Sequence, residues 1–144
     1  METRKGFSLI EFMIVIAVFA ILAAVAAPFF SEQIKLAHET AAVQQIKTLH
    51  TMQAQYYAQF GRYANNLTEL GPPPAGAGLI PRTLANGRKS GYLMDLQSTA
   101  DGYALTAVPE KFGSTGRRTF YSDHTQVIHQ NWSREPADAD SPEI

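Results

Sequence analysis

The chain has 144 residues, with 12 lysines and arginines against 13 aspartates and glutamates, for a formal net charge of −1 at neutral pH. This length accommodates one domain with at most one appendage and excludes a multidomain enzyme. With 45% hydrophobic and 17% charged residues, the chain is too apolar to be disordered. It contains no cysteine, which excludes disulfides, thiolate metal ligands and a cysteine nucleophile. The near-neutral charge gives no reason to expect binding to a polyanion.

The first feature along the chain is an apolar run at residues 12–30, FMIVIAVFAILAAVAAPFF, without a charged or hydrogen-bonding side chain. As a helix rising about 1.5 Å per residue, it would span roughly 28 Å, close to the hydrocarbon thickness of a bilayer. We therefore expect one membrane span. A cleaved secretory signal is the alternative, although it requires a shorter apolar core. Arg4 and Lys5 precede the run and Glu32 follows it, so the positive-inside rule places the N-terminus in the cytoplasm.

The residues KGFSLIEFMIV, from Lys5 to Val15, resemble the processing signature of the type IV prepilin and pseudopilin family. The resemblance implies that a prepilin peptidase cleaves between Gly6 and Phe7 and then methylates the new amino group of Phe7. It makes Glu11 the fifth mature residue, where this family carries a glutamate needed for subunit assembly. It makes Pro28 the twenty-second, where many members carry a proline.

The chemistry of this signature leaves three interpretations of Glu11. Cleavage would create a cationic α-amine at Phe7, and a cation in apolar surroundings needs an anionic partner. Glu11 could pair with the Phe7 amine of a neighbouring subunit, as the resemblance implies, or with its own, because residues four apart share a helix face. Alternatively, the carboxylate lies at headgroup level, in water. Pro28 is expected to bend or locally melt the helix between residues 24 and 30, or only to mark the membrane exit.

Beyond the apolar run, a helical pattern continues from Ser31 to Phe60, and Gly61 is expected to end it. Its apolar face comprises Ala42, Ile46, Leu49, Gln53, Tyr56 and Phe60; its opposite face carries Glu39, Gln45, Lys47, Gln55 and Gln59. A loop-rich connector follows, with one short helix at Leu67–Leu70 capped by Asn65 or Asn66. Four strands are expected at 92–97, 103–108, 118–121 and 126–130. Their apolar face, including Tyr92, Leu105, Phe120 and Val127, would cover the helix.

These elements predict an α+β, type IV pilin-like fold, in which one long N-terminal helix, first transmembrane and then amphipathic, packs on a small antiparallel sheet of about four strands. The expected divisions are a leader removed on maturation at 1–6, a transmembrane or filament-core helix at 7–30, its amphipathic continuation at 31–61, a connecting loop at 62–90, the sheet at 91–132 and a flexible acidic tail at 133–144.

The resemblance implies a structural subunit, or pilin, that polymerises into a type IV pilus or related filament for adhesion, motility or DNA uptake. It implies four kinds of partner: further copies or other pilins, the prepilin peptidase, an inner-membrane assembly platform and, before assembly, membrane lipid. The subunit would lie in the inner membrane as a single-pass protein and later in an extracellular pilus. A pseudopilin of a type II secretion system, in a periplasmic pseudopilus, is the first alternative, and a single-pass membrane-anchored binding domain is the second.

Catalysis has no support in the sequence. We expect no catalytic residue, no cofactor and no metal site, since the four histidines, His38, His50, His124 and His129, lack ligand spacing. No glycine-rich phosphate-binding motif is present. Nucleic acid is expected at most as an indirect partner, because a solvated strand edge explains Arg117 and Arg118.

Overall fold

A computed structural model describes residues 6–144, so the expected leader lies, apart from Gly6, outside the described residues. The chain divides into one unit ending at Ile34 and a second unit, the head, spanning Lys35–Ile144. The helices are α1 (Leu9–Phe60), α2 (Leu67–Leu70) and α3 (Arg82–Ala85). The strands are β1 (Arg88–Lys89), β2 (Tyr92–Thr99), β3 (Gly102–Pro109), β4 (Thr119–Asp123) and β5 (Ile128–Asn131). The expected α+β class is confirmed, with five antiparallel strands rather than about four.

Helix α1 continues without interruption through Pro28, although proline lacks the amide hydrogen that the carbonyl four residues earlier would accept. The hydroxyl of Ser31 donates to the Pro28 carbonyl oxygen at 2.9 Å. The described structure therefore keeps the backbone helical where local melting was one expectation. A bend at Pro28 stays a prediction.

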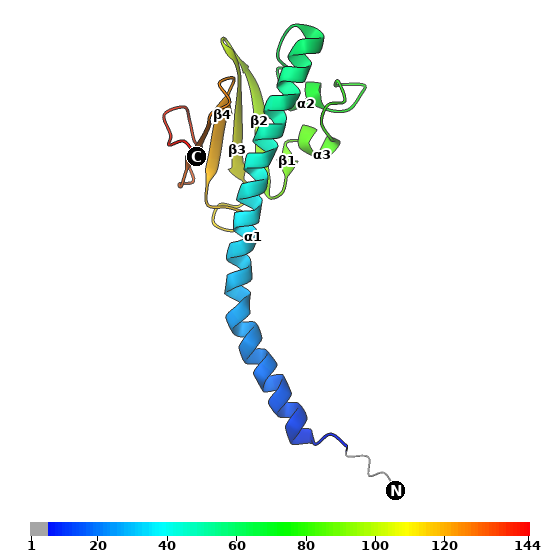
Figure 1. Cartoon of the computed structure of the whole chain (residues 1–144), viewed down its shortest axis with the longest axis vertical. Helices are drawn as coiled ribbons and strands as arrows, with labels where there is room; N and C mark the ends of the chain where they lie inside the picture. The colour runs from blue at the N-terminus through cyan, green and yellow to red at the C-terminus, as the bar shows by residue number, and fades with distance from the viewer. Residues whose placement is uncertain (1–5) are drawn as a thin grey trace. The chain divides into compact units, whose positions relative to one another are not determined.

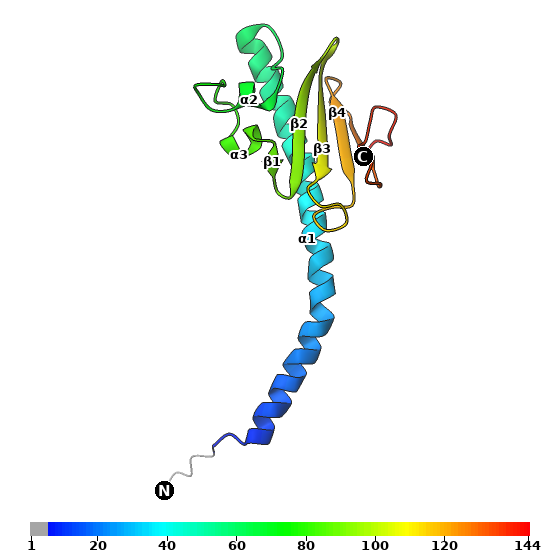
Figure 2. The ribbon, with the colours of Figure 1, turned by 180° about the vertical axis from the view of Figure 1, so that it is seen from behind.

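In the head, the part of α1 that begins at Lys35 lies along one face of the sheet (Figures 1 and 2). The expected contact residues Ala42, Ile46, Leu49, Gln53 and Tyr56 are all buried. Two residues of the helical pattern differ from expectation. Phe60, in the last turn, is 54% exposed and stacks on Tyr56 instead, with ring centroids 4.4 Å apart. Glu39 was expected on the exposed face but is only 3% exposed, because its carboxylate forms an ion pair with Arg118. A pattern of apolar residues cannot reveal such a charged partner.

The sheet has the simple order β1-β2-β3-β4-β5, with every neighbouring pair antiparallel. Thr99 pairs with Gly102, which leaves a two-residue hairpin loop between β2 and β3 close to the expected Asp101-Gly102 turn. The last strand begins later than expected, because Gln126 has a φ of 67° and still belongs to the turn. Ile128 consequently faces the core, whereas Val127, expected there, is 37% exposed.

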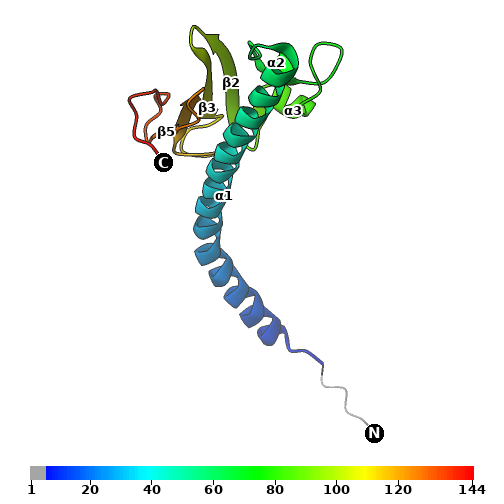
Figure 3. The same ribbon diagram turned by 45° about the horizontal axis from the view of Figure 1, so that its top comes forward.

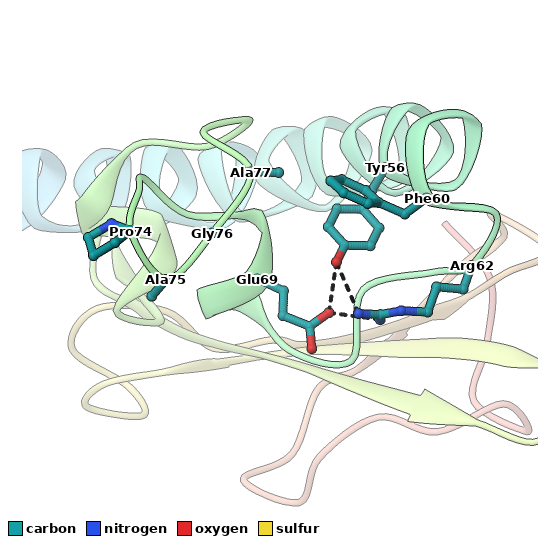
Figure 4. Close-up of a pocket in the computed structure, with 8 residues that line it drawn as sticks. All are labelled: Tyr56, Phe60, Arg62, Glu69, Pro74, Ala75, Gly76 and Ala77. Atoms are coloured by element: carbon teal, nitrogen blue, oxygen red, sulfur yellow. Dashed lines mark hydrogen bonds and ion pairs between the residues drawn. The ribbon is translucent and has the colours of Figure 1, made fainter.

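The connector between α1 and the sheet contains more regular structure than expected. The Asn66 side chain caps α2 by accepting from the Glu69 amide at 3.1 Å, as one of the two expected caps. Helix α3 and the short strand β1 lie within the stretch expected to be loop. The Arg62 guanidinium donates to a Glu69 carboxylate oxygen at 2.9 Å, and the Tyr56 hydroxyl donates to the same oxygen at 3.1 Å (Figure 4). These contacts hold the connector against the end of α1.

The C-terminal residues, expected to form a flexible tail, run beside β5 instead (Figure 3). The amide of Gln130 donates to the Pro142 carbonyl at 2.8 Å, and the amide of Ile144 donates to the Ile128 carbonyl at 3.1 Å. Ala137, in the same C-terminal segment, is only 3% exposed. The tail therefore covers part of the outer edge of the sheet, and the reason is backbone pairing that its acidic, proline-containing sequence does not reveal.

Candidate functional site: the N-terminal apolar segment

The first part of α1 is apolar around its whole circumference and makes no buried contact in the described structure. All its large hydrophobic side chains from Leu9 to Phe30 are exposed. This helix is long and apolar enough to cross a membrane. Signal sequences near an N-terminus meet the same criteria of length and composition. A helix that is hydrophobic on every side belongs inside a bilayer or inside other protein. We therefore expect lipid or other protein to enclose this segment.

The processing signature occupies the start of this helix. Gly6, Phe7 and Ser8 precede the first helical residue, and Phe7 is 80% exposed. The amide of Phe12 donates to the Ser8 carbonyl at 3.2 Å, which makes Ser8 the N-cap residue of α1. The expected cleavage bond, between Gly6 and Phe7, thus lies in non-helical chain immediately before the helix.

Glu11 is exposed and is the acidic residue of the first helical turn. A serine at the N-cap with a glutamate three residues later is the capping-box pattern, and a carboxylate in this turn also complements the positive end of the helix. The Ser8-to-Glu11 spacing is therefore a local sequence signal for the start of α1. Residues four apart share a face only within a helix, and Phe7 lies outside α1. Helix geometry therefore does not bring Glu11 to the Phe7 of its own chain in this structure.

A second set of polar contacts joins the head end of α1 to the sheet. The Glu39 carboxylate accepts from the Arg117 amide at 2.7 Å and from the Arg118 Nε at 2.8 Å. Arg118 also donates to Gln130 at 3.0 Å, and its guanidinium lies over the ring of Trp132, 5.0 Å from the centroid. Arg118 was expected at a solvated strand edge, but its side chain is only 17% exposed, because Glu39 compensates its charge within the head.

His50 is the second buried polar anchor of α1, and it binds side chains of the neighbouring strands β3 and β4. Ser122 donates its hydroxyl hydrogen to the Val127 carbonyl at 2.6 Å, so its oxygen accepts from His50 Nε2 at 2.7 Å. His50 Nδ1 then accepts from the Tyr103 hydroxyl at 2.7 Å. This network assigns the neutral Nε2-protonated tautomer.

The electrostatics of the His50 network agree with that assignment. Burial lowers the pKa of His50 below its ordinary value of 6.5, against the weaker opposing influence of Asp123. Burial likewise raises the pKa of Tyr103 to about 12, so the phenol keeps its proton and remains a donor. The network is a structural anchor whose groups satisfy one another.

The remaining cavity and polar side chains of the head are explained by structural contacts. A cavity of about 330 Å³ lies beside Tyr56, Phe60 and Arg62, but the charged side chains that line it, Arg62 and Glu69, bind each other (Figure 4). Among residues 6–144, no group of three or more histidines and carboxylates is placed to hold a metal ion. The N-terminal segment is therefore the feature that points to a function.

Comparison with known proteins identifies the class of this segment. Residues 1–27 match the family model described as the prokaryotic N-terminal methylation motif. The match covers the expected cleavage bond, Phe7 and Glu11, and confirms the resemblance to prepilin-type N-termini. It leaves the role of each of these residues untested.

Curated relatives give a more specific similarity. The chain is 37% identical over 71 residues, 49% of its length, to the type IV major pilin protein PilA of Myxococcus xanthus. It is 38% identical over 74 residues, 50% of its length, to the type IV major pilin protein PilE1 of Neisseria gonorrhoeae. It is 43% identical over 51 residues, 35% of its length, to a fimbrial protein of Pseudomonas aeruginosa. These matches span only 32%, 45% and 33% of the respective relatives. No solved structure matches the chain significantly.

Proposed function

We propose that this protein is a pilin, a structural subunit without catalytic activity that polymerises into a type IV pilus or a related filament. The observation that carries the proposal is the fully exposed apolar helix that directly follows a prepilin-type processing signature. A folded head with its own buried core is attached to this helix. A subunit of this kind gains stability when the helix is enclosed, first by lipid and then by the helices of other subunits.

The proposed maturation begins on the cytoplasmic side of the inner membrane. A prepilin peptidase removes residues 1–6 and methylates Phe7, which leaves a cationic amine at the start of the apolar segment. Glu11 of an incoming subunit then pairs with the Phe7 amine of a neighbour at the assembly platform. The position of Phe7 outside α1 supports pairing between subunits over pairing within one chain. Pro28, at which one backbone hydrogen bond is missing, is the proposed place where α1 bends as subunits leave the membrane.

The first experiment expresses the full chain with and without a prepilin peptidase and measures the intact mass and N-terminus of the membrane-extracted product. We expect loss of residues 1–6 and addition of one methyl group to Phe7 only when the peptidase is present. An unprocessed chain under both conditions, or a cut after the apolar run, would refute the proposal.

The second experiment distinguishes a pilus from a secretion pseudopilus. Cells that carry the protein and its assembly machinery are sheared, and the released material is imaged by electron microscopy. Long extracellular fibres that contain this chain are expected, because the matched relatives are named pilins and fimbrial proteins. Fibres confined to the periplasm, with loss of protein secretion on deletion, would favour the pseudopilin alternative.

A further inference from the structure

The two edges of the sheet carry opposite charge. At one edge, residues 82–91 include α3 and β1 and contain three basic residues, Arg82, Arg88 and Lys89, and no acidic residue. Arg82 and Arg88 are exposed, and Lys89 is partly exposed. Glu110 lies 3.9 Å from Arg88, but the exposed Lys111 follows it, so this basic edge keeps its positive excess.

The opposite edge is acidic. The C-terminal segment, residues 132–144, runs beside β5 and contains four acidic residues against one basic residue, Arg134. The acidic residues are Glu135, Asp138, Asp140 and Glu143, and all four are exposed. Because β1 and β5 are the first and last strands of the sheet, the basic and acidic edges lie on opposite sides of the head (Figure 1).

We propose that the basic edge of one subunit, formed by Arg82, Arg88 and Lys89, docks against the acidic C-terminal edge of a neighbouring copy of this chain. The inference rests on the proposed function and adds to it which surfaces of the head meet. Docking of identical edges would bring like charges together, and these would repel. Docking of unlike edges is attractive and leaves one free edge of each kind on every growing assembly.

This asymmetry has a consequence for the form of the assembly. A contact between two different surfaces of the same subunit either closes into a ring or repeats as an open helical filament, whereas a contact between identical surfaces stops at a dimer. The edges therefore favour continued addition of subunits around a filament whose centre would be formed by the apolar helices. Exposed charges attract over a Debye length of about 10 Å at 0.1 M salt, so the contact weakens as salt rises.

Chemical cross-linking tests the proposed contact directly, because the chain contains no cysteine. The variants Lys89→Cys, Asp140→Cys and the double variant are expressed in cells with the assembly machinery, and sheared fibres are treated with a short bismaleimide. We expect a ladder of covalent multimers from the double variant and monomer from each single variant. Dimers from either single variant, or monomer from the double variant in intact fibres, would overturn the inference.

Charge reversal supplies a second, independent test. Reversal of the basic edge (Arg82, Arg88 and Lys89 to Glu), or of the acidic edge (Glu135, Asp140 and Glu143 to Lys), should lower the sheared-fibre yield about tenfold or more. Asp138 is left unchanged because its carboxylate accepts from the Ser141 hydroxyl at 2.8 Å and helps to shape the tail. The two reversals combined in one chain should restore the yield, since unlike edges again meet.

The outcome for the combined variant separates the docking contact from damage to the head. If each reversal alone lowers the yield and the combination lowers it further, the edges do not meet and the inference is overturned. The wild-type chain is measured in parallel, and the amount of processed subunit in the membrane is measured for every variant. If the wild-type chain forms fibres and the combined variant does not recover the fibre yield, the docking contact alone is overturned. If the wild-type chain forms no fibres, both the docking contact and the proposed function are overturned.

Discussion

The buried ion pair between Glu39 and Arg118 allows a quantitative prediction. In Glu39→Gln, the amide oxygen can accept from only one of the two donors, the Arg117 amide or the Arg118 Nε, and its NH₂ group faces the other. Removal of one partner from a buried pair typically costs 3–5 kcal/mol, because the remaining charge has no compensation. Arg118 keeps its bond to Gln130 and is 17% exposed, so we expect about 3 kcal/mol, the lower end of that range.

This loss can be measured as a change in melting temperature. For a unit of about 110 residues, Lys35–Ile144, 1 kcal/mol corresponds to about 4 °C, so Glu39→Gln should melt about 12 °C lower. The assay is thermal unfolding of the full chain in detergent, followed by near-ultraviolet circular dichroism and by tryptophan fluorescence. Trp132 is the single tryptophan and lies over Arg118, so its emission should also change in the folded variant.

Two matched variants show whether the charge of the buried pair is responsible. Glu110→Gln breaks the exposed contact with Arg88 at 3.9 Å and should lower the melting temperature by no more than about 4 °C. Adding Arg118→Gln to Glu39→Gln removes the uncompensated charge and should recover part of the lost stability. If Glu39→Gln melts within about 4 °C of the wild type, as Glu110→Gln is expected to, the reasoning is refuted.

Three further predictions concern the other anchors and the assembly residue. Burial lowers the pKa of His50, so this side chain binds a proton more readily in the unfolded chain than in the folded one, and stability should fall as pH drops below about 6.5. The melting temperature should therefore differ more between pH 7.5 and 5.5 in the wild type than in His50→Gln. In Gly116→Ala, the added Cβ would meet the Tyr92 hydroxyl, which donates to the Arg118 carbonyl, and the displacement should cost about 1–3 kcal/mol in urea unfolding. Glu11→Ala should leave the subunit processed and membrane-inserted but should sharply lower the sheared-fibre yield.

Each of these predictions has a result that contradicts it. An equal pH dependence in the wild type and in His50→Gln would show that His50 does not titrate differently in the folded and unfolded chains. Unchanged urea unfolding of Gly116→Ala would show that the loop moves away from Tyr92 without cost. A normal fibre yield from processed Glu11→Ala would remove the basis for pairing between Glu11 and the Phe7 amine.

Features that depend on neighbouring residues could be read from the sequence. The apolar run requires a membrane or other helices because nineteen consecutive residues lack polar side chains, whatever the rest of the chain does. The end of α1 at Phe60, the Asn66 cap and the β2–β3 hairpin follow from local backbone preferences. The processing signature is likewise a short linear pattern, and the matched methylation motif lies within the first 27 residues.

Features that depend on distant residues were decided only by the tertiary structure. Glu39 and Arg118 are separated by 79 positions, and each alone has the pattern of an exposed charge. His50 becomes a neutral anchor only because Tyr103 and Ser122, from two different strands, meet its two nitrogens. The C-terminal segment is fixed by backbone hydrogen bonds to β5, and backbone groups are the same in every sequence. Charge compensation and strand pairing across the head therefore appear only when the chain is folded.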